Sequence, residues 1–168
     1  MNNYLAKSNP KETIQQHTDN LIYNFNVLKS VYPDLEINWD MLYLACLYHD
    51  LGKMNLKFQR RIETGKFSEA EIPHGILSLA FLDVKKLKIK GFSNDEIKVL
   101  AHSIAYHHER QLEFDNKILE EEIELVSKEA VNFAYEKIKD IKVKRLGAKY
   151  FAKDRIYQKD NEKAFFNY

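Results

Sequence analysis

The feature that most constrains this chain is a continuous apolar segment, Met41–Leu47, that leads directly into Tyr48-His49-Asp50-Leu51-Gly52-Lys53. A segment that is apolar on every side is typical of a buried central helix rather than of an amphipathic surface helix. Gly52 is a natural helix stop, so we expect His49 and Asp50 on the last turn of that helix. An imidazole and a carboxylate are costly to desolvate without a partner, and a bound metal ion would supply one. A His-Asp pair alone is a weak motif, so this interpretation depends on the rest of the chain.

Length and composition indicate one domain, with or without a tail. The chain has 168 residues, of which 45% are hydrophobic, and this is enough for one core. Its 26 basic and 25 acidic residues give a net charge of +1, so binding to nucleic acid requires a local basic patch. The single cysteine, Cys46, excludes an intrachain disulfide and fits a reducing compartment. With a polar N-terminus and no apolar segment of about 18 residues, we expect a cytoplasmic protein without a membrane partner.

Capping signals and helical periodicity predict an all-α fold, a compact bundle of about six or seven helices. The motif Asn9-Pro10-Lys11-Glu12 predicts the start of a first helix, and Asn38 is expected to cap the buried helix. Pro73 is expected to open a helix whose apolar period extends to Leu87. Ser93-Asn94-Asp95-Glu96 is a capping box for the next helix. No alternating pattern predicts a strand.

Two further segments are distinguished by their charge. Residues 54–62 are expected to form a short helix with a basic side. Residues 112–129 are acidic and keep a helical period that continues to Phe133, so we interpret their carboxylates as a solvated helix face. Residues 142–163 are strongly basic and polar.

Five of the six histidines, together with Asp50, fall at helix ends or on apolar stripes of four predicted helices. These histidines are His17, His49, His74, His107 and His108. Ligands from several helices can converge in the core of a bundle. Imidazole and carboxylate ligands suit one or two ions of Mn, Fe, Co, Ni or Zn, with Mg as a further candidate. The alternative, a histidine satisfied within the core, stays open for His17 and is preferred for His102.

In sequence order, these motifs resemble the HD superfamily. The motifs are His17, then His49-Asp50-Leu51-Gly52-Lys53, then Pro73-His74 with Ser78, then Ala105-Tyr106-His107-His108. With the opening Tyr4-Leu5-Ala6-Lys7-Ser8, they are similar, more narrowly, to the HD nuclease domain of the CRISPR type I helicase-nuclease, in its fused or stand-alone form. The resemblance covers about residues 4–110.

The resemblance implies a metal-dependent nuclease that cleaves single-stranded DNA, acting with a helicase domain or subunit and a CRISPR surveillance complex. The ligands that it implies are His17, His49 and Asp50 for a first ion, and Asp50, His74, His107 and His108 for a second. Asp50 would bridge the two ions, and Lys53 would reach toward a phosphate. For Lys53, the alternative is a lysine that only complements the helix dipole.

The chemistry of phosphodiester hydrolysis is compatible with such a site, because two metal ions can activate water and neutralise the charge on the phosphate. A nuclease also needs a path for its strand. The basic residues beside the motif are Lys53, Lys57, Arg60, Arg61 and Lys66, with Phe58 and Phe67 as candidates for stacking on bases. The alternative is a solvated helix face with Phe58 in the core.

Two other functions stay open, an HD phosphohydrolase for a small nucleotide and a catalytically impaired HD helical module. The resembled family carries one more aspartate ligand on a late buried helix, and this sequence has no such motif. Asp154 and Asp160 lie in a polar, basic stretch. We therefore expect residues 1–168 to be a single HD domain truncated before its last helix or helices, unless Asp154 replaces the missing carboxylate. Such a truncation would weaken the first metal position and expose apolar surface that favours self-association.

Overall fold

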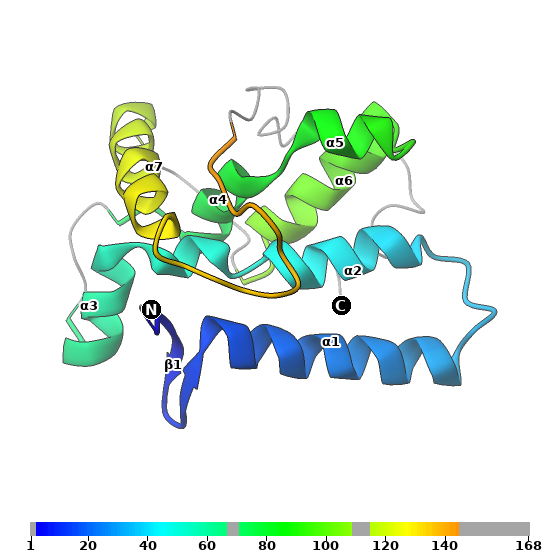
Figure 1. The fold of residues 1–168 in the computed structure, drawn as a ribbon, viewed down its shortest axis with the longest axis horizontal. Helices are drawn as coiled ribbons and strands as arrows, with labels where there is room; N and C mark the ends of the chain where they lie inside the picture. Colours follow the sequence, from blue (N-terminus) through cyan, green and yellow to red (C-terminus); the bar gives the residue numbers. More distant parts are fainter. Residues whose placement is uncertain (1–2, 67–70, 109–114, 145–168) are drawn as a thin grey trace.

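The computed structural model describes residues 3–66, 71–108 and 115–144 of the chain. These residues form seven α-helices, two 3-10 helices and one two-stranded antiparallel sheet (Figure 1). The prediction of an all-α fold with six or seven helices is confirmed, except for the small sheet, which the sequence pattern did not predict. In the described part of the chain, no helix combines the length and the hydropathy that crossing a membrane requires.

The chain begins with a β-hairpin rather than with a helix. Strand β1 (Leu5–Ser8) pairs antiparallel with strand β2 (Lys11–Thr13), and α1 (Ile14–Val31) follows directly. The helix start predicted at Asn9-Pro10 was wrong, because these two residues lie in the hairpin turn. The cap is Thr13 instead. Its side chain accepts a hydrogen bond from the backbone of Gln16, whose own side chain bonds back to the Thr13 backbone, so the two residues form the capping box.

Helix α2 (Trp39–Tyr48) begins at its predicted cap, because the Asn38 side chain accepts a hydrogen bond from the backbone N–H of Met41 at 3.0 Å. The helix is less enclosed than predicted, since only three of its residues are buried. It ends at His49, and the chain then tightens into the 3-10 helix η1 (Leu51–Met54). The His-Asp pair therefore lies at the junction of the two helices, directly after the last turn on which the sequence predicted it.

Gly52 lies inside η1 and is not a helix stop. A Cβ atom at this position would lie 2.0 Å from the backbone oxygen of His74 and 2.8 Å from the Cβ of Leu77. The Gly52 backbone N–H also donates to the hydroxyl of Ser78 at 2.8 Å. Only glycine lets the backbone of η1 approach α4 (His74–Ser78) this closely.

The region after η1 contains more helix ends than predicted. Asn55 caps α3 (Leu56–Thr64) with its side chain. The single helix expected from Pro73 to Leu87 is instead divided into α4, the 3-10 helix η2 (Leu79–Phe81) and α5 (Val84–Ile89). The Asp83 side chain accepts a hydrogen bond from the backbone of the first turn of α5, so it caps a new helix where the apolar period alone suggested continuity.

Helix α6 (Asn94–Ala105) starts at the predicted capping box, in which Ser93 and Glu96 bond reciprocally. The acidic segment contains α7 (Asn116–Ala130), as expected. The predicted extension of its helical period to Phe133 was wrong, because the chain after α7 runs irregularly as far as the described residues reach.

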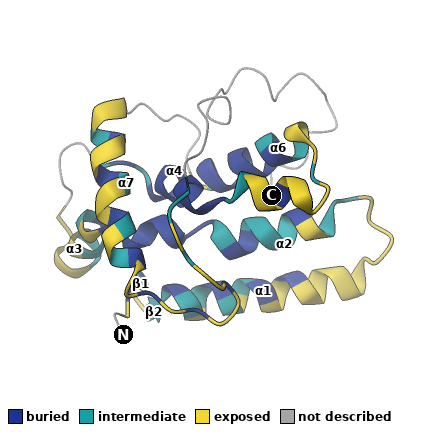
Figure 2. Ribbon diagram, turned by 45° about the horizontal axis from the view of Figure 1, so that its top comes forward, coloured by how far each residue is buried: buried dark blue, intermediate teal, exposed yellow. Residues whose placement is uncertain are grey.

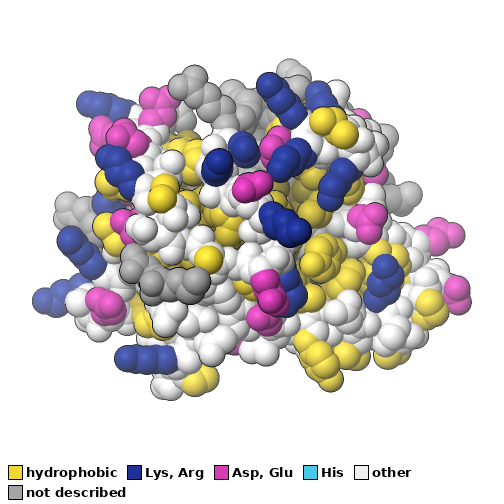
Figure 3. Space-filling model, viewed as in Figure 1, with side chains coloured by type: hydrophobic (Ala, Val, Ile, Leu, Met, Phe, Trp, Pro, Cys, Tyr) yellow, Lys and Arg dark blue, Asp and Glu magenta, His cyan; other side chains and the backbone are white. Residues whose placement is uncertain are grey.

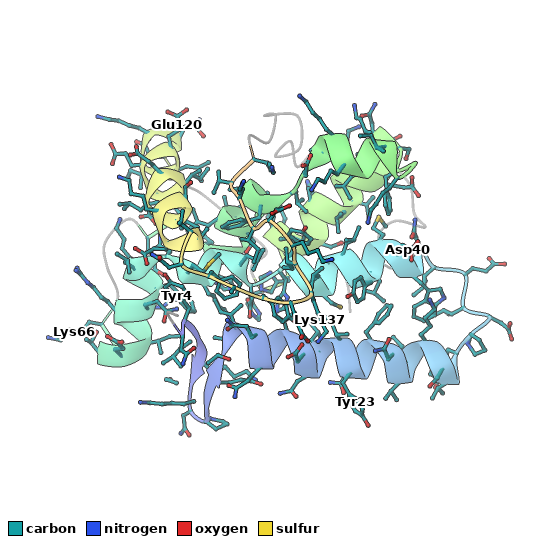
Figure 4. All side chains as sticks on the ribbon, viewed as in Figure 1. Tyr4, Tyr23, Asp40, Lys66, Glu120 and Lys137 are labelled. Atoms are coloured by element: carbon teal, nitrogen blue, oxygen red, sulfur yellow. The ribbon has the colours of Figure 1, made fainter. Side chains whose placement is uncertain are left out.

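The helices pack around a central segment formed by α2, η1 and α4. Helix α1 packs on one side of α2 and α6 packs on the other, while α3 and α7 both contact η1 (Figure 1). Buried residues concentrate in η1, α4 and α6, whereas the C-terminal half of α1 is exposed (Figure 2). Tyr23 projects from this half of α1 into solvent (Figure 4). The core therefore surrounds the segment that carries the His-Asp motif.

Candidate metal centre

Asp50 is the centre of a cluster of imidazoles that come from different parts of the fold. Its side chain is almost fully buried, with 1% of the residue exposed. Two groups could each hold a metal ion, with the candidate ligand atoms of each group within 4.8 Å of one another. The groups are His17, His49 and Asp50, and Asp50, His74, His107 and His108. The structure thus brings together all six residues that the sequence singled out as ligands, in the two sets implied by the resemblance.

Each carboxylate oxygen of Asp50 faces two imidazole nitrogens. Oδ2 lies 3.4 Å from His17 Nε2 and 3.2 Å from His49 Nε2. Oδ1 lies 3.4 Å from His74 Nε2 and 3.5 Å from His107 Nε2. One carboxylate is therefore placed to serve both groups, which is the geometry that a bridging ligand needs.

Backbone carbonyls orient two of these imidazoles. His49 Nδ1 donates to the Cys46 carbonyl oxygen at 2.8 Å, and His107 Nδ1 donates to the Ile104 carbonyl oxygen at 2.6 Å. Because a carbonyl oxygen accepts only, the proton of each neutral ring lies on Nδ1, and the Nε2 lone pair faces Asp50. This arrangement fixes the tautomer that binds a metal.

His17 is oriented by a carboxylate instead of a carbonyl. Its Nδ1 lies 3.1 Å from Glu12 Oε2, and burial lowers the pKa of His17. The sequence placed Glu12 at a helix start, where it would have had no link to the cluster. No local signal marks this contact, because it depends on the hairpin that sets Glu12 beside the helix.

The donor set fits a divalent cation. Asp50 Oδ1 is buried and makes no hydrogen bond within the described part of the chain. His74 Nε2 and His107 Nε2 lie 3.2 Å apart and both face this oxygen. Imidazole nitrogens and a carboxylate that converge in this way are the ligands that transition-metal ions prefer.

The electrostatic environment supports the same protonation state. Burial acts to raise the pKa of Asp50, but the polar surroundings of the carboxylate outweigh burial and hold this pKa below its ordinary value. Burial lowers the pKa of His74 to about 4. Partial desolvation of its ring and the neighbouring His107 lower the pKa of His108 to about 4, although the residue is exposed at one edge. At neutral pH the carboxylate is charged and these two imidazoles are neutral, as metal ligands must be.

Lys53 lies on the carboxylate rather than in an open cleft. It is 5% exposed, and its ammonium donates to Asp50 Oδ2 at 2.7 Å. The ammonium also lies 5.5 Å from the ring centroid of Phe58, which is itself buried. For Phe58, the alternative interpretation as a core residue is therefore correct. Lys53 adds a fixed positive charge beside the metal ligands.

Ser78 connects the segment of His49 and Asp50 to the segment of His74, and these segments carry three of the six candidate ligands. Its fully buried hydroxyl lies 2.7 Å from the carbonyl oxygen of His49 and 2.8 Å from that of His74, and it accepts the Gly52 N–H. The Pro-His…Ser spacing of the sequence thus corresponds to one hydroxyl that holds η1 against α4.

The basic residues expected to line a strand path are partly engaged by acids. Lys57 contacts Glu122, and Arg61 Nη1 lies 3.0 Å from Glu71 Oε1. Arg60 is exposed, as is Lys66, which Figure 4 shows at the outer edge of α3. On the face seen in Figure 3, basic and acidic side chains are interspersed, and no histidine of the described residues is visible. Phe67, Asp154 and Asp160 lie outside the described residues.

Glu122 is an exception to the predicted solvated acidic face, on which Glu120, Glu121 and Glu124 are exposed as expected. It is 1% exposed, and its carboxylate accepts from Asn55 Nδ2 at 2.7 Å and from the Lys57 ammonium. The sequence did contain a signal for this burial, because Glu122 lies on the apolar stripe of α7 between Leu119 and Val126. This carboxylate ties α7 to the residues that directly follow η1.

His102 agrees with its preferred structural interpretation. It is 1% exposed on α6, belongs to neither metal-binding group, and its ring centroid lies 5.2 Å from that of Tyr106.

Comparison with known proteins gives a match to a protein family. A protein-family model described as "HD domain" matches residues 14–144, a range that contains every residue of both metal-binding groups. No curated protein and no solved structure matches the chain.

Proposed function

The chain belongs to the HD domain family, whose members are typically metal-dependent hydrolases, and from this premise we propose that it is a metal-dependent phosphodiesterase that cleaves single-stranded DNA. The observation that carries the proposal is the convergence of five imidazoles on the buried carboxylate of Asp50. A bound divalent ion supplies positive charge that stabilises the phosphoryl transition state and activates water for attack.

The protein's own residues contribute position and charge. His17, His49 and Asp50 would hold one ion, and His74, His107 and His108 would complete a second position on the other oxygen of Asp50. The ammonium of Lys53 would stabilise negative charge that develops on the phosphate, because a fixed cation in a buried site is screened little by water.

Single-stranded DNA is proposed as the substrate because the second group reaches the surface. His108 is exposed and its ring centroid lies 4.2 Å from that of His107, so this edge of the cluster is open to a ligand. The exposed cations Arg60 and Lys66 would attract a phosphate backbone. From the resemblance to the HD nuclease domain of the CRISPR type I helicase-nuclease, we propose that a helicase domain or subunit and a CRISPR surveillance complex would deliver the strand in the cytoplasm.

A small nucleotide is the second candidate substrate, and one observation favours it. Lys53, Lys57 and Arg61 each contact a carboxylate, which reduces the positive charge available to a long strand. A compact substrate with one phosphodiester or phosphate group needs only the metal ligands and Lys53.

Elemental analysis combined with a cleavage assay tests both candidates. We expect the purified protein to bind one or two Mn²⁺, Co²⁺, Ni²⁺, Fe²⁺ or Zn²⁺ ions and to cleave single-stranded DNA when loaded. Strand binding should weaken steeply with salt through counterion release, whereas turnover of a small nucleotide should change little. Asp19→Ala serves as the control, because it removes a carboxylate that contacts Tyr135 and Lys137 and belongs to neither metal-binding group. Hydrolysis of small nucleotides without cleavage of DNA would favour the second candidate.

A further inference from the structure

We propose that Glu12 is a positioning residue for the metal ligand His17, and that the β1–β2 hairpin serves to deliver its carboxylate. The inference rests on the proposed metal-dependent function and adds to it a residue outside both metal-binding groups. Glu12 would act through His17 by holding the proton on Nδ1 and so presenting the Nε2 lone pair to the metal position.

The His17 ring lies between two carboxylates. Its Nδ1 is 3.1 Å from Glu12 Oε2, and its Nε2 is 3.4 Å from Asp50 Oδ2. A neutral imidazole carries one proton, and either carboxylate can accept it. If the proton is on Nε2, it points at Asp50 and blocks coordination by that nitrogen. If it is on Nδ1, Glu12 accepts it and Nε2 is free to bind a metal ion.

The Glu12 carboxylate is held for this purpose by residues of the hairpin and the helix. The Lys7 ammonium lies 2.8 Å from Oε2, and Asn20 Nδ2 donates to Oε1 at 2.6 Å. Lys7 and Glu12 are directly paired across the two strands. Both oxygens are therefore fixed, and only 13% of the side chain is exposed, so the carboxylate cannot easily turn away from His17.

The contact also places a second negative charge beside the first group, in addition to that of Asp50. His49 and His107 donate their Nδ1 protons to backbone carbonyls, which are neutral, whereas His17 faces a carboxylate. A carboxylate partner makes an imidazole a stronger ligand than a carbonyl partner does. The group of His17, His49 and Asp50 contains one carboxylate among its ligands, so the charge of Glu12 offsets part of the charge of a divalent ion.

The competing explanation is that Glu12 only stabilises the hairpin through Lys7 and Asn20. Glu12→Ala removes both that role and the contact with His17. Glu12→Gln keeps an oxygen that can accept from His17 Nδ1 but removes the charge. Asp19→Ala is the matched control, because Asp19 is also a carboxylate that connects α1 to another segment through Lys137 (Figure 4) and Tyr135.

Two measurements on the intact chain distinguish these explanations. The first is the Kd for Co²⁺ and Mn²⁺ by calorimetry. We expect it to rise by about 10- to 100-fold at one position in Glu12→Ala, by less in Glu12→Gln, and not at all in Asp19→Ala. The second is the long-range ¹H–¹⁵N spectrum of the histidine rings in the metal-free protein, with His17 assigned by its loss in His17→Asn. We expect one Nδ1–H tautomer in the wild type and in Asp19→Ala, and a mixture of tautomers in Glu12→Ala.

Unchanged metal affinity in Glu12→Ala, or an unchanged His17 tautomer, would overturn the inference. An equal loss of affinity in Asp19→Ala would also overturn it, because the effect would then follow from general loosening of α1. If Glu12→Ala does not fold, the same two readouts on Glu12→Gln decide. If the wild-type protein binds no metal, the proposed function itself is contradicted. If the wild type binds metal and the Glu12 variants bind it equally well, only the role of Glu12 is contradicted.

Discussion

The buried Glu122 carboxylate predicts a large effect of a substitution in a segment that looks like a solvated acidic face. In Glu122→Ala, the buried Asn55 amide loses its acceptor, which costs about 1–3 kcal/mol. The Lys57 ammonium also loses its partner, but a third of that side chain is exposed, so water limits this cost to about 1 kcal/mol. The one methylene group lost from the core, Cγ, contributes about 0.8 kcal/mol. We therefore expect the free energy of unfolding to fall by about 3–5 kcal/mol.

Urea denaturation followed by circular dichroism measures this change, and Glu121→Ala is the matched control. Glu121 is exposed and adjacent on α7, so its substitution should change the free energy of unfolding by less than about 0.5 kcal/mol. In a chain of this length, the expected loss in Glu122→Ala corresponds to a Tm lower by about 10 °C. Glu122→Gln should lose less, since an amide oxygen can still accept from Asn55. A Glu122→Ala protein within about 1 kcal/mol of Glu121→Ala would refute this reasoning.

Three further predictions concern the metal centre. Gly52→Ala should destabilise the fold by about 3 kcal/mol or more and abolish metal binding, because the new methyl group would lie 2.0 Å from the His74 carbonyl oxygen. A Gly52→Ala protein with wild-type stability in urea denaturation would refute this prediction. The free energy of unfolding of the metal-free protein should fall as the pH is lowered from about 6.5 to about 4. In this window the unfolded chain binds protons at His74 and His108 that the folded chain does not, so the slope should be smaller in His74→Gln than in the wild type, and an equal slope in the two proteins would refute the assignment. Lys53→Ala should lower the cleavage rate and leave the metal content unchanged, and loss of metal in this variant would show that the lysine maintains the site rather than acting on the phosphate.

The sequence predicted those features that depend on local interactions. The cap at Asn38 and the capping box of Ser93 and Glu96 were correct, because a cap bonds to backbone groups two or three residues away. The division of the helix at Asp83 was missed, since the apolar period continues across the new cap and the capping signal was weaker than the pattern. The cluster around Asp50 was predicted as a set because its members lie in four separate sequence motifs, and the resemblance implied that these motifs converge.

The features that were missed depend on contacts between distant segments. The β1–β2 hairpin is tied to α3 by Gln59, whose side chain accepts from the backbone of Leu5 and donates to its carbonyl oxygen. Nothing within either strand indicates this pairing. The roles of Glu12 and Gly52 have the same origin, because each is set by a neighbour that only the tertiary structure provides.

The measurement that tests the central claim most directly is the metal content of wild type and Asp50→Ala, determined by elemental analysis after dialysis against Mn²⁺ or Co²⁺. Both oxygens of Asp50 face imidazole nitrogens, so this one carboxylate serves both groups. We predict one or two bound ions in the wild type and none in Asp50→Ala, with the helical circular dichroism spectrum retained. Equal metal content in the two folded proteins would contradict the assignment of Asp50 as the centre of the metal site.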